Sequence, residues 1–160
     1  MLRYVDVKEV FSEIPNEITL AISISGCPIH CKGCHSKYLW KEKGKTLDWG
    51  ALNALIHIHH GITCVLFSGG DNNPGDVDKL ATHIRSSFPE LKIAWYSGQE
   101  EISDDIDTVN FDYIKVGPYI EENGPLNSRT TNQVLWKFTR SENNPLVSQE
   151  DITSMFWKNV

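Results

Sequence analysis

The chain has 160 residues, of which 40% are hydrophobic and 22% are charged, a balance typical of a globular protein with its own core. Its formal net charge of -6 argues against non-specific binding to nucleic acids, which requires a basic surface. No apolar run is long enough to span a bilayer, and the charged first ten residues contain no signal-peptide core. We therefore expect one domain over residues 1–160, a cytoplasmic location, and neither a nucleic acid nor a membrane as partner.

Segments typical of strands and helices alternate along the first half of the chain. An additional N-terminal strand is predicted at residues 2–10, and a β-branched strand at residues 18–25. Residues 46–60 have the start and stop signals of a helix. Residues 62–67 form the continuous apolar run of a strand that is buried on both faces.

The second half of the chain continues the alternation. Residues 74–88 are predicted to form a helix, because apolar residues recur at one-face spacing. Three strands are predicted at residues 91–96, 111–116 and 134–139, and a short helix at residues 100–106. A terminal helix is predicted at residues 148–157, because Ser148 and Asp151 have the spacing of a capping box.

This order of elements predicts an α/β fold of about five to six β/α units, too few for a closed eight-fold barrel. We expect an open partial (β/α) barrel with a mostly parallel sheet of about five to six strands. In such sheets the loops after the strands carry the chemistry. Four unusual segments follow predicted strands and are expected to share one site: residues 26–35, 68–71, 97–98 and 117–119.

Three of the four cysteines, Cys27, Cys31 and Cys34, have C-x3-C-x2-C spacing. Such clustering in a cytoplasmic protein indicates a metal or redox site. Each thiolate of this short loop can reach a different iron of one cubane. Iron–sulfur clusters usually have four thiolate ligands, so three would leave one iron open for catalysis. The spacing favours a [4Fe–4S] cluster, with a zinc site that adds His30 or His35 as the alternative.

The fourth cysteine, Cys64, lies within the apolar run of a predicted strand. A cysteine in such a position usually behaves as a small hydrophobic residue. We therefore interpret Cys64 as part of the core.

The cysteine segment resembles the radical S-adenosylmethionine superfamily, in which C-x3-C-x2-C follows a first strand. Its form here, Gly-Cys-Pro-x-x-Cys-x-Gly-Cys-His, is similar to that of the activating proteins of anaerobic (class III) ribonucleotide reductase. The resemblance implies a partial barrel of the radical S-adenosylmethionine type, with Gly33 and His35 among the cofactor-binding residues. Gly33 replaces the aromatic residue that is usual in the superfamily, so backbone atoms would meet the adenine ring.

Two later loops extend this resemblance. In the family, the motif that matches Ser68, Gly69, Gly70 and Asp71 contacts the amino group of the methionine moiety, and Asp71 stands where a longer glutamate is common. A Lys-Val-Gly-Pro-Tyr segment with Gly117 at its centre, followed by Gly-Pro-Leu and Thr-Asn-Gln, is similar to a family region near the cofactor. From composition alone, both loops are equally compatible with ordinary turns.

The function implied by the resemblance is that of an oxidoreductase that activates another enzyme. A low-potential donor such as flavodoxin would supply one electron through the cluster to cleave S-adenosylmethionine. The resulting radical would take a hydrogen atom from a glycine of the reductase large subunit. Two alternatives remain: the same chemistry on another glycyl radical enzyme or a small molecule, and a non-enzymatic zinc-binding adaptor.

Overall fold

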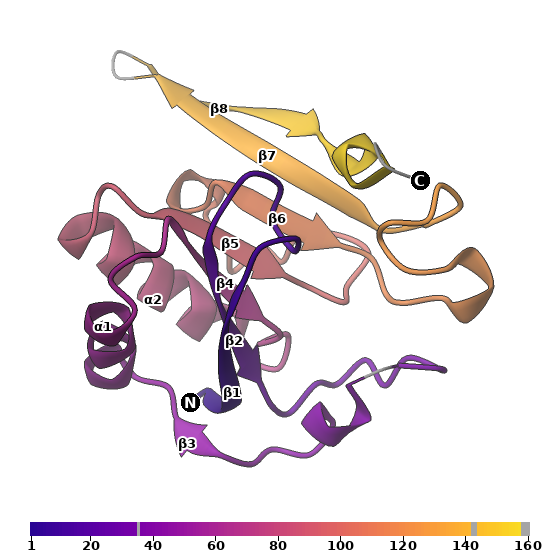
Figure 1. Ribbon diagram of the computed structural model, residues 1–160, viewed down its shortest axis with the longest axis horizontal. Helices are drawn as coiled ribbons and strands as arrows, with labels where there is room; N and C mark the ends of the chain where they lie inside the picture. Colours follow the sequence, from indigo (N-terminus) through magenta and orange to yellow (C-terminus); the bar gives the residue numbers. More distant parts are fainter. Residues whose placement is uncertain (35, 142–143, 158–160) are drawn as a thin grey trace.

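The computed structural model describes residues 1–34, 36–141 and 144–157 (Figure 1). Within these ranges eight strands form one sheet in the order β3-β1-β2-β4-β5-β6-β7-β8. The strands are β1 (Arg3–Val10), β2 (Thr19–Ile24), β3 (Lys45–Thr46), β4 (Cys64–Ser68), β5 (Lys92–Tyr96), β6 (Tyr113–Val116), β7 (Val134–Ser141) and β8 (Asn144–Asp151). The α-helices are α1 (Trp49–Ile58) and α2 (Pro74–Ser87), and the 3-10 helices are η1 (Lys37–Leu39), η2 (Thr108–Asn110), η3 (Glu121–Asn123) and η4 (Thr153–Trp157).

The predicted open partial barrel with a mostly parallel sheet of five to six strands is wrong. The sheet is mixed, and four of its seven strand pairings in the described residues are antiparallel: β1 with β2, β1 with β3, β6 with β7, and β7 with β8. Parallel neighbours need long crossover connections, usually through a helix. The described residues contain only two α-helices, and the connection from β1 to β2 is short enough to reverse the chain direction directly.

Most predicted elements occur where expected, but two predicted helices do not form. Residues 100–106 are irregular, and only the short η2 follows them. The predicted terminal helix at residues 148–157 is wrong because β8 continues to Asp151 and pairs with β7. The Asp151 carboxylate accepts hydrogen bonds from the backbone N–H and the hydroxyl of Thr153, at 2.9 and 2.6 Å. Asp151 therefore binds the first residue of η4 and does not lie in the first turn of a helix that begins near Ser148.

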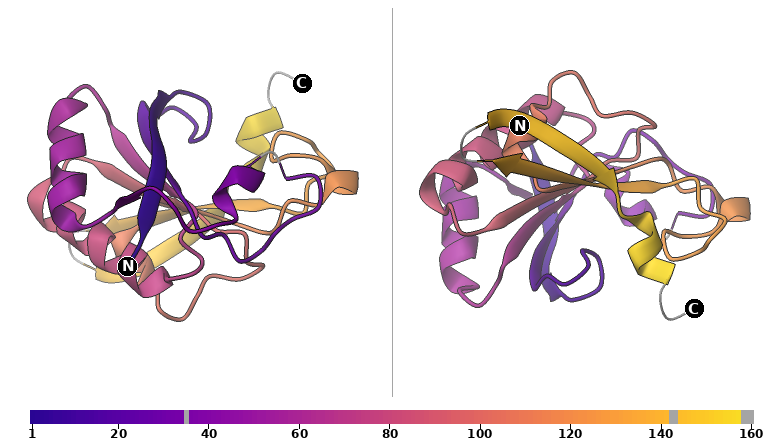
Figure 2. Two further views of the ribbon diagram at one scale, coloured as in Figure 1. Left: turned by 90° about the horizontal axis from the view of Figure 1, so that it is seen from below. Right: turned by 90° about the horizontal axis from the view of Figure 1, so that it is seen from above.

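The two faces of the sheet are covered differently. Both α-helices lie on one face (Figure 2), where α2 buries Val77, Leu80, Ala81 and Ile84 against the larger hydrophobic core. The other face carries a smaller core that includes Ile14 from the β1–β2 connection and packs against Met155 and Phe156 of η4. Cys64 is fully buried in this smaller core, so the prediction that it is a core residue is confirmed.

The central strands β2, β4, β5 and β6 run parallel and end together. Ser23 pairs with Ser68, Ser68 with Tyr96, and Tyr96 with Lys115, so these four residues form a row across the sheet. The loops that follow this row emerge at one end of the sheet, where the segment after β2 and the loop after β6 lie on the same side of the molecule (Figures 1 and 2). Among the described residues, none of the helices has the length and apolar character needed to cross a bilayer.

Candidate functional site

The loop that carries the three clustered cysteines is closed at its base by backbone hydrogen bonds. The N–H groups of Gly26 and Cys27 both donate to the carbonyl oxygen of Leu39, at 2.7 and 3.0 Å. The hydroxyl of the buried Ser25 donates to the carbonyl of Lys43 at 2.6 Å and accepts from its N–H at 2.9 Å. Gly26 has a φ of +82°, a left-handed conformation that glycine adopts without steric cost. The start of the loop is therefore fixed against the segment that contains η1.

The side chains of Cys27, Cys31 and Cys34 are partly exposed and line one cavity of about 170 Å³. The same cavity is lined by residues at or beyond the ends of the other parallel strands: Ser68 at the end of β4 with Gly69 and Asp71 after it, Gly98 after β5, and Gly117 and Tyr119 after β6. The four segments that the sequence singled out thus meet around one space. The ligand-binding roles of these residues stay predictions.

Three thiols line this cavity, those of Cys27, Cys31 and Cys34. Within the described ranges, no group of three or more His, Cys, Asp or Glu side chains is placed to hold a metal ion. One thiol already accepts a hydrogen bond, because the N–H of Ser36 lies 3.3 Å from Sγ of Cys34. Such N–H···S contacts are common around iron–sulfur clusters.

Gly69 forms the floor of the loop after β4. Its φ is +108°, and a Cβ atom there would lie 2.8 Å from the carbonyl oxygen of Ile24. The indole N–H of Trp95 donates to the Gly69 carbonyl at 2.7 Å. Gly70 is turned toward α2 instead, because a Cβ atom on it would lie 2.6 Å from Cγ2 of Val77. Gly69 lines the cavity. Gly70 instead allows α2 to pack closely against the loop after β4.

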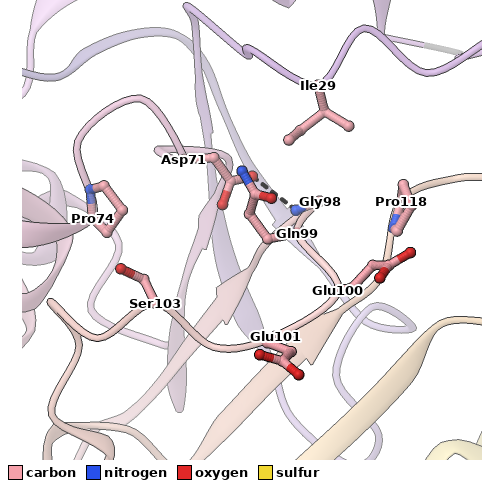
Figure 3. Close-up of a pocket in the computed structure, with 9 residues that line it drawn as sticks. All are labelled: Ile29, Asp71, Pro74, Gly98, Gln99, Glu100, Glu101, Ser103 and Pro118. Atoms are coloured by element: carbon pink, nitrogen blue, oxygen red, sulfur yellow. Dashed lines mark hydrogen bonds between the residues drawn. The ribbon is translucent and has the colours of Figure 1, made fainter.

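Asp71 joins two loops and borders two cavities. Its carboxylate accepts a hydrogen bond from the Ser97 hydroxyl at 2.6 Å and another from the Gly98 N–H at 2.8 Å. It lines the cysteine cavity and also a larger neighbouring cavity of about 700 Å³. In Figure 3 the second of these bonds is drawn between Asp71 and Gly98, with Ile29 across the cavity from them.

The larger cavity has an acidic character. Besides Asp71 it is lined by Glu100 and Glu101, which lie in the loop after β5 (Figure 3). It shares Ile29, Asp71 and Gly98 with the cysteine cavity. The two cavities are therefore neighbours, and carboxylates line the larger one.

Gly33 and His35 were both predicted to bind the cofactor. Gly33 has a φ of +75°, and a Cβ atom there would lie 2.9 Å from Cδ of Glu121. Its missing side chain thus makes room for η3, and Gly33 is not among the residues that line the cysteine cavity. His35 lies outside the described residues. His30, the other histidine of the zinc alternative, stacks its ring on Trp40 with centroids 4.5 Å apart.

Lys115 is a charged residue of the site that the sequence analysis did not predict. Lys115 lies in β6 and lines the cysteine cavity, although only 9% of its surface is exposed. Burial lowers the pKa of its ammonium group to about 8, while Asp71 and the three clustered cysteines act in the opposite direction. A lysine within an otherwise apolar strand was the signal that could have identified it, since buried lysines are rare unless they are paired.

The loop before β7 holds Lys115 in place. The ammonium group donates to Oε1 of Gln133 at 3.1 Å and to the carbonyl of Gly117 at 3.4 Å. Gly117 has a φ of +108°, and a Cβ atom on it would lie 3.0 Å from Cα of Gln133. The side chain of Asn132 donates to the carbonyl of Pro118 at 3.1 Å. Gln133 therefore orients the buried cation, and Asn132 fixes the turn beside it.

Residues 18–116 match the model of a family described as "4Fe-4S single cluster domain". The matched region is more than half of the chain, begins just before β2 and ends with β6, and contains all three clustered cysteines. Searches among curated proteins and among solved structures found no match.

Proposed function

Since the chain belongs to the family of 4Fe-4S single cluster domains and is an iron–sulfur protein, we propose that it is a radical enzyme that activates anaerobic ribonucleotide reductase. Cys27, Cys31 and Cys34 would hold three irons of one [4Fe–4S] cluster. The fourth iron would remain open for S-adenosylmethionine. The site is built on the parallel strands β2, β4, β5 and β6.

A cluster held by Cys27, Cys31 and Cys34 would supply one electron for the reductive cleavage of a carbon–sulfur bond of S-adenosylmethionine, which would give methionine and a 5′-deoxyadenosyl radical. This radical would take one hydrogen atom from a glycine Cα of the large reductase subunit. The products are 5′-deoxyadenosine and a glycyl radical in the partner. Each activation would therefore consume one electron from a low-potential donor such as flavodoxin, and both proteins would act in the cytoplasm.

The observation that carries the proposal is the cavity shared by the three cysteines and the loops after three further parallel strands. Gly69 and Gly117 bring backbone to the cavity surface without side chains, as close contact with a cofactor requires. Lys115 supplies a buried positive charge that the methionine carboxylate can neutralise. An electron carrier would need the cysteines alone, whereas these extra groups suit a bound small molecule.

The neighbouring cavity supports a role for a protein substrate. It is about 700 Å³ in volume and adjoins the cysteine cavity through Ile29, Asp71 and Gly98. A loop of a partner protein could enter through this cavity and reach a radical formed at the cysteine side. Closure by the partner would exclude water from the reaction.

Anaerobic purification and iron–sulfur reconstitution test the proposal. We expect a brown protein with about four irons per chain, release of 5′-deoxyadenosine on reduction with S-adenosylmethionine, and a glycyl radical signal in electron paramagnetic resonance when the reductase is present. A colourless protein with stoichiometric zinc and no iron would overturn the proposal in favour of a zinc-binding adaptor. Cleavage without a radical in the reductase would redirect it to another target.

A further inference from the structure

We infer that a lysine-rich surface beside the cysteine loop is the docking site for an acidic electron-carrier protein. We use the name lysine face for the five exposed lysines of the segment 32–45, which are Lys32, Lys37, Lys41, Lys43 and Lys45. The inference rests on the proposed function, because it names the surface through which the electron arrives.

The lysine face is an exception in an acidic protein. Residues 32–45 contain five lysines and one glutamate and carry a charge of +4, whereas the other 146 residues contain ten basic and twenty acidic residues and carry -10. A local field of opposite sign attracts partners of complementary charge and speeds their association. The chain is negatively charged as a whole but carries a local positive charge at residues 32–45.

The side chains of the lysine face are available to a partner. All five lysines are exposed, and within the described part of the chain none of them forms an ion pair. Two are held by aromatic rings, with Nζ of Lys37 5.9 Å from the Trp40 ring and Nζ of Lys43 5.7 Å from the Tyr38 ring. Tyr38 itself is 48% exposed. Exposed aromatic residues such as Tyr38 are enriched in protein interfaces.

The lysine face is directly connected to the cysteine cavity. Leu39, buried within the same segment, lines the cavity, and its carbonyl accepts the hydrogen bonds of Gly26 and Cys27. Ser36, which precedes η1, also lines the cavity and donates to the sulfur of Cys34. A carrier bound on this segment would be separated from the thiolates by a thin layer of protein. Electron transfer requires such proximity, because its rate falls steeply with distance.

A second basic surface lies in the wrong place for electron transfer. Lys92, Lys137, Arg85 and Arg140 surround a cavity of about 320 Å³. Lys92 begins β5, whereas the cysteine cavity borders the loop after this strand. The strand alone separates the two by about 13 Å at the usual rise per residue. Its arginines are also occupied, since both bind the carboxylate of Asp112, at 2.9 and 3.0 Å.

This second surface provides a matched control for charge reversal. The test variant carries Lys37→Glu and Lys41→Glu, and the control variant carries Lys92→Glu and Lys137→Glu. All four lysines are exposed, and both variants change the net charge equally. The probe is flavodoxin, an acidic carrier that contains flavin mononucleotide. Its affinity is measured in the oxidised form by calorimetry, and the rate at which its reduced form reduces the reconstituted protein is measured by stopped flow.

We expect the test variant to lose about tenfold in both affinity and reduction rate at low ionic strength, and the loss to shrink as salt screens the charges. The control variant should stay within about twofold of the wild type. Reduction by photoexcited deazaflavin, a small molecule that needs no docking surface, should be equal in all three proteins. Equal losses in both variants, or a loss in the control alone, would overturn the inference.

The design separates this inference from the proposed function. If deazaflavin reduces the wild-type cluster but S-adenosylmethionine is not cleaved, the proposed function fails. The affinity of flavodoxin for the lysine face is measured without any cleavage and still decides the docking site. If S-adenosylmethionine is cleaved with deazaflavin as the reductant, but the lysine reversals change neither the affinity for flavodoxin nor the rate of reduction by it, only the docking inference fails.

Discussion

The hydroxyl of Ser97 donates a hydrogen bond of 2.6 Å to the carboxylate of Asp71 and ties the loop after β5 to the loop after β4. Ser97 is fully buried, and the second carboxylate oxygen accepts the N–H of Gly98 at 2.8 Å. The loops after the two strands are therefore joined through Asp71 at the candidate site. Asp71 has a structural role there, whatever it contacts in a bound cofactor.

Replacing Asp71 should test this structural role. Asp71→Ala removes both acceptors, leaves the buried Ser97 hydroxyl without this acceptor and should lower the free energy of unfolding by about 2 kcal/mol. Asp71→Asn keeps one acceptor oxygen and should cost about half as much. Urea unfolding of the apo-protein measures both values. Identical stabilities for the two variants and the wild type would contradict the loop-joining role.

Gly69 should tolerate no side chain. Gly69→Ala places a Cβ 2.8 Å from a backbone oxygen at a φ of +108°, and we expect a loss of at least about 2 kcal/mol in the free energy of unfolding. Gly61→Ala is the matched control, because a Cβ there meets nothing within 4 Å. Its effect should stay within about 0.5 kcal/mol. Thermal and urea unfolding measure the stability of both variants. Equal stabilities of Gly69→Ala and Gly61→Ala would contradict the requirement for glycine at position 69.

Replacing Cys27, Cys31 or Cys34 by alanine should abolish iron binding and cleavage of S-adenosylmethionine while the fold is retained, since these side chains are partly exposed on a loop. Iron analysis, assay of 5′-deoxyadenosine and circular dichroism measure these three properties. Cleavage at the wild-type rate in any of these variants would refute the cluster assignment.

Cys64→Ala serves as the comparison for the clustered cysteines. Cys64 is fully buried in the smaller core, so the substitution should cost about 1 kcal/mol of stability. Activity should remain within a few-fold of the wild type. Complete loss of cleavage with an intact fold would show that this thiol is not merely structural.

Lys115 should make the stability of the apo-protein depend on pH in the alkaline range. Burial lowers its pKa from 10.5 to about 8, so between these values the unfolded chain holds a proton that the folded chain has released. The free energy of unfolding due to this residue therefore rises with pH across this window, by about 3 kcal/mol in total. It is lowest below pH 8, where the charged ammonium must be buried.

The measurement is the difference in the free energy of unfolding between the wild type and Lys115→Met at several values from pH 7 to 10. We expect the wild type to gain stability relative to the variant as the pH rises. Since other titrating groups are common to both proteins, their contributions largely cancel. A constant difference across this range would mean that Lys115 remains charged in the folded protein.

The local elements could be predicted from the sequence because their signals are local. The apolar run before Ser68 and the one-face spacing in α2 define a buried strand and an amphipathic helix without reference to the rest of the chain. The direction of strand pairing is not a local property. The antiparallel pairings of β7 with β6 and β8 depend on contacts such as Trp136 with Asp151, which periodicity cannot reveal.

The candidate site shows the same division. Parallel strands end at one edge, so the meeting of the segments at Cys27, Gly69, Gly98 and Gly117 follows from their places after strands. The position of Gly33 against Glu121, and the burial of Lys115 beside Gln133, depend on how η3 and the loop before β7 return to the sheet. Such contacts between distant segments have no signature in the residues on either side.

The double hydrogen bond at the base of the cysteine loop makes two amide protons reporters of loop opening. The N–H groups of Gly26 and Cys27 share the Leu39 carbonyl as acceptor, so their exchange with deuterium requires the loop and η1 to separate. Exchange at these two positions measures the free energy of that separation in a protein with or without its metal. The same two amides would slow when a partner presses on η1, and thus distinguish docking there from docking elsewhere.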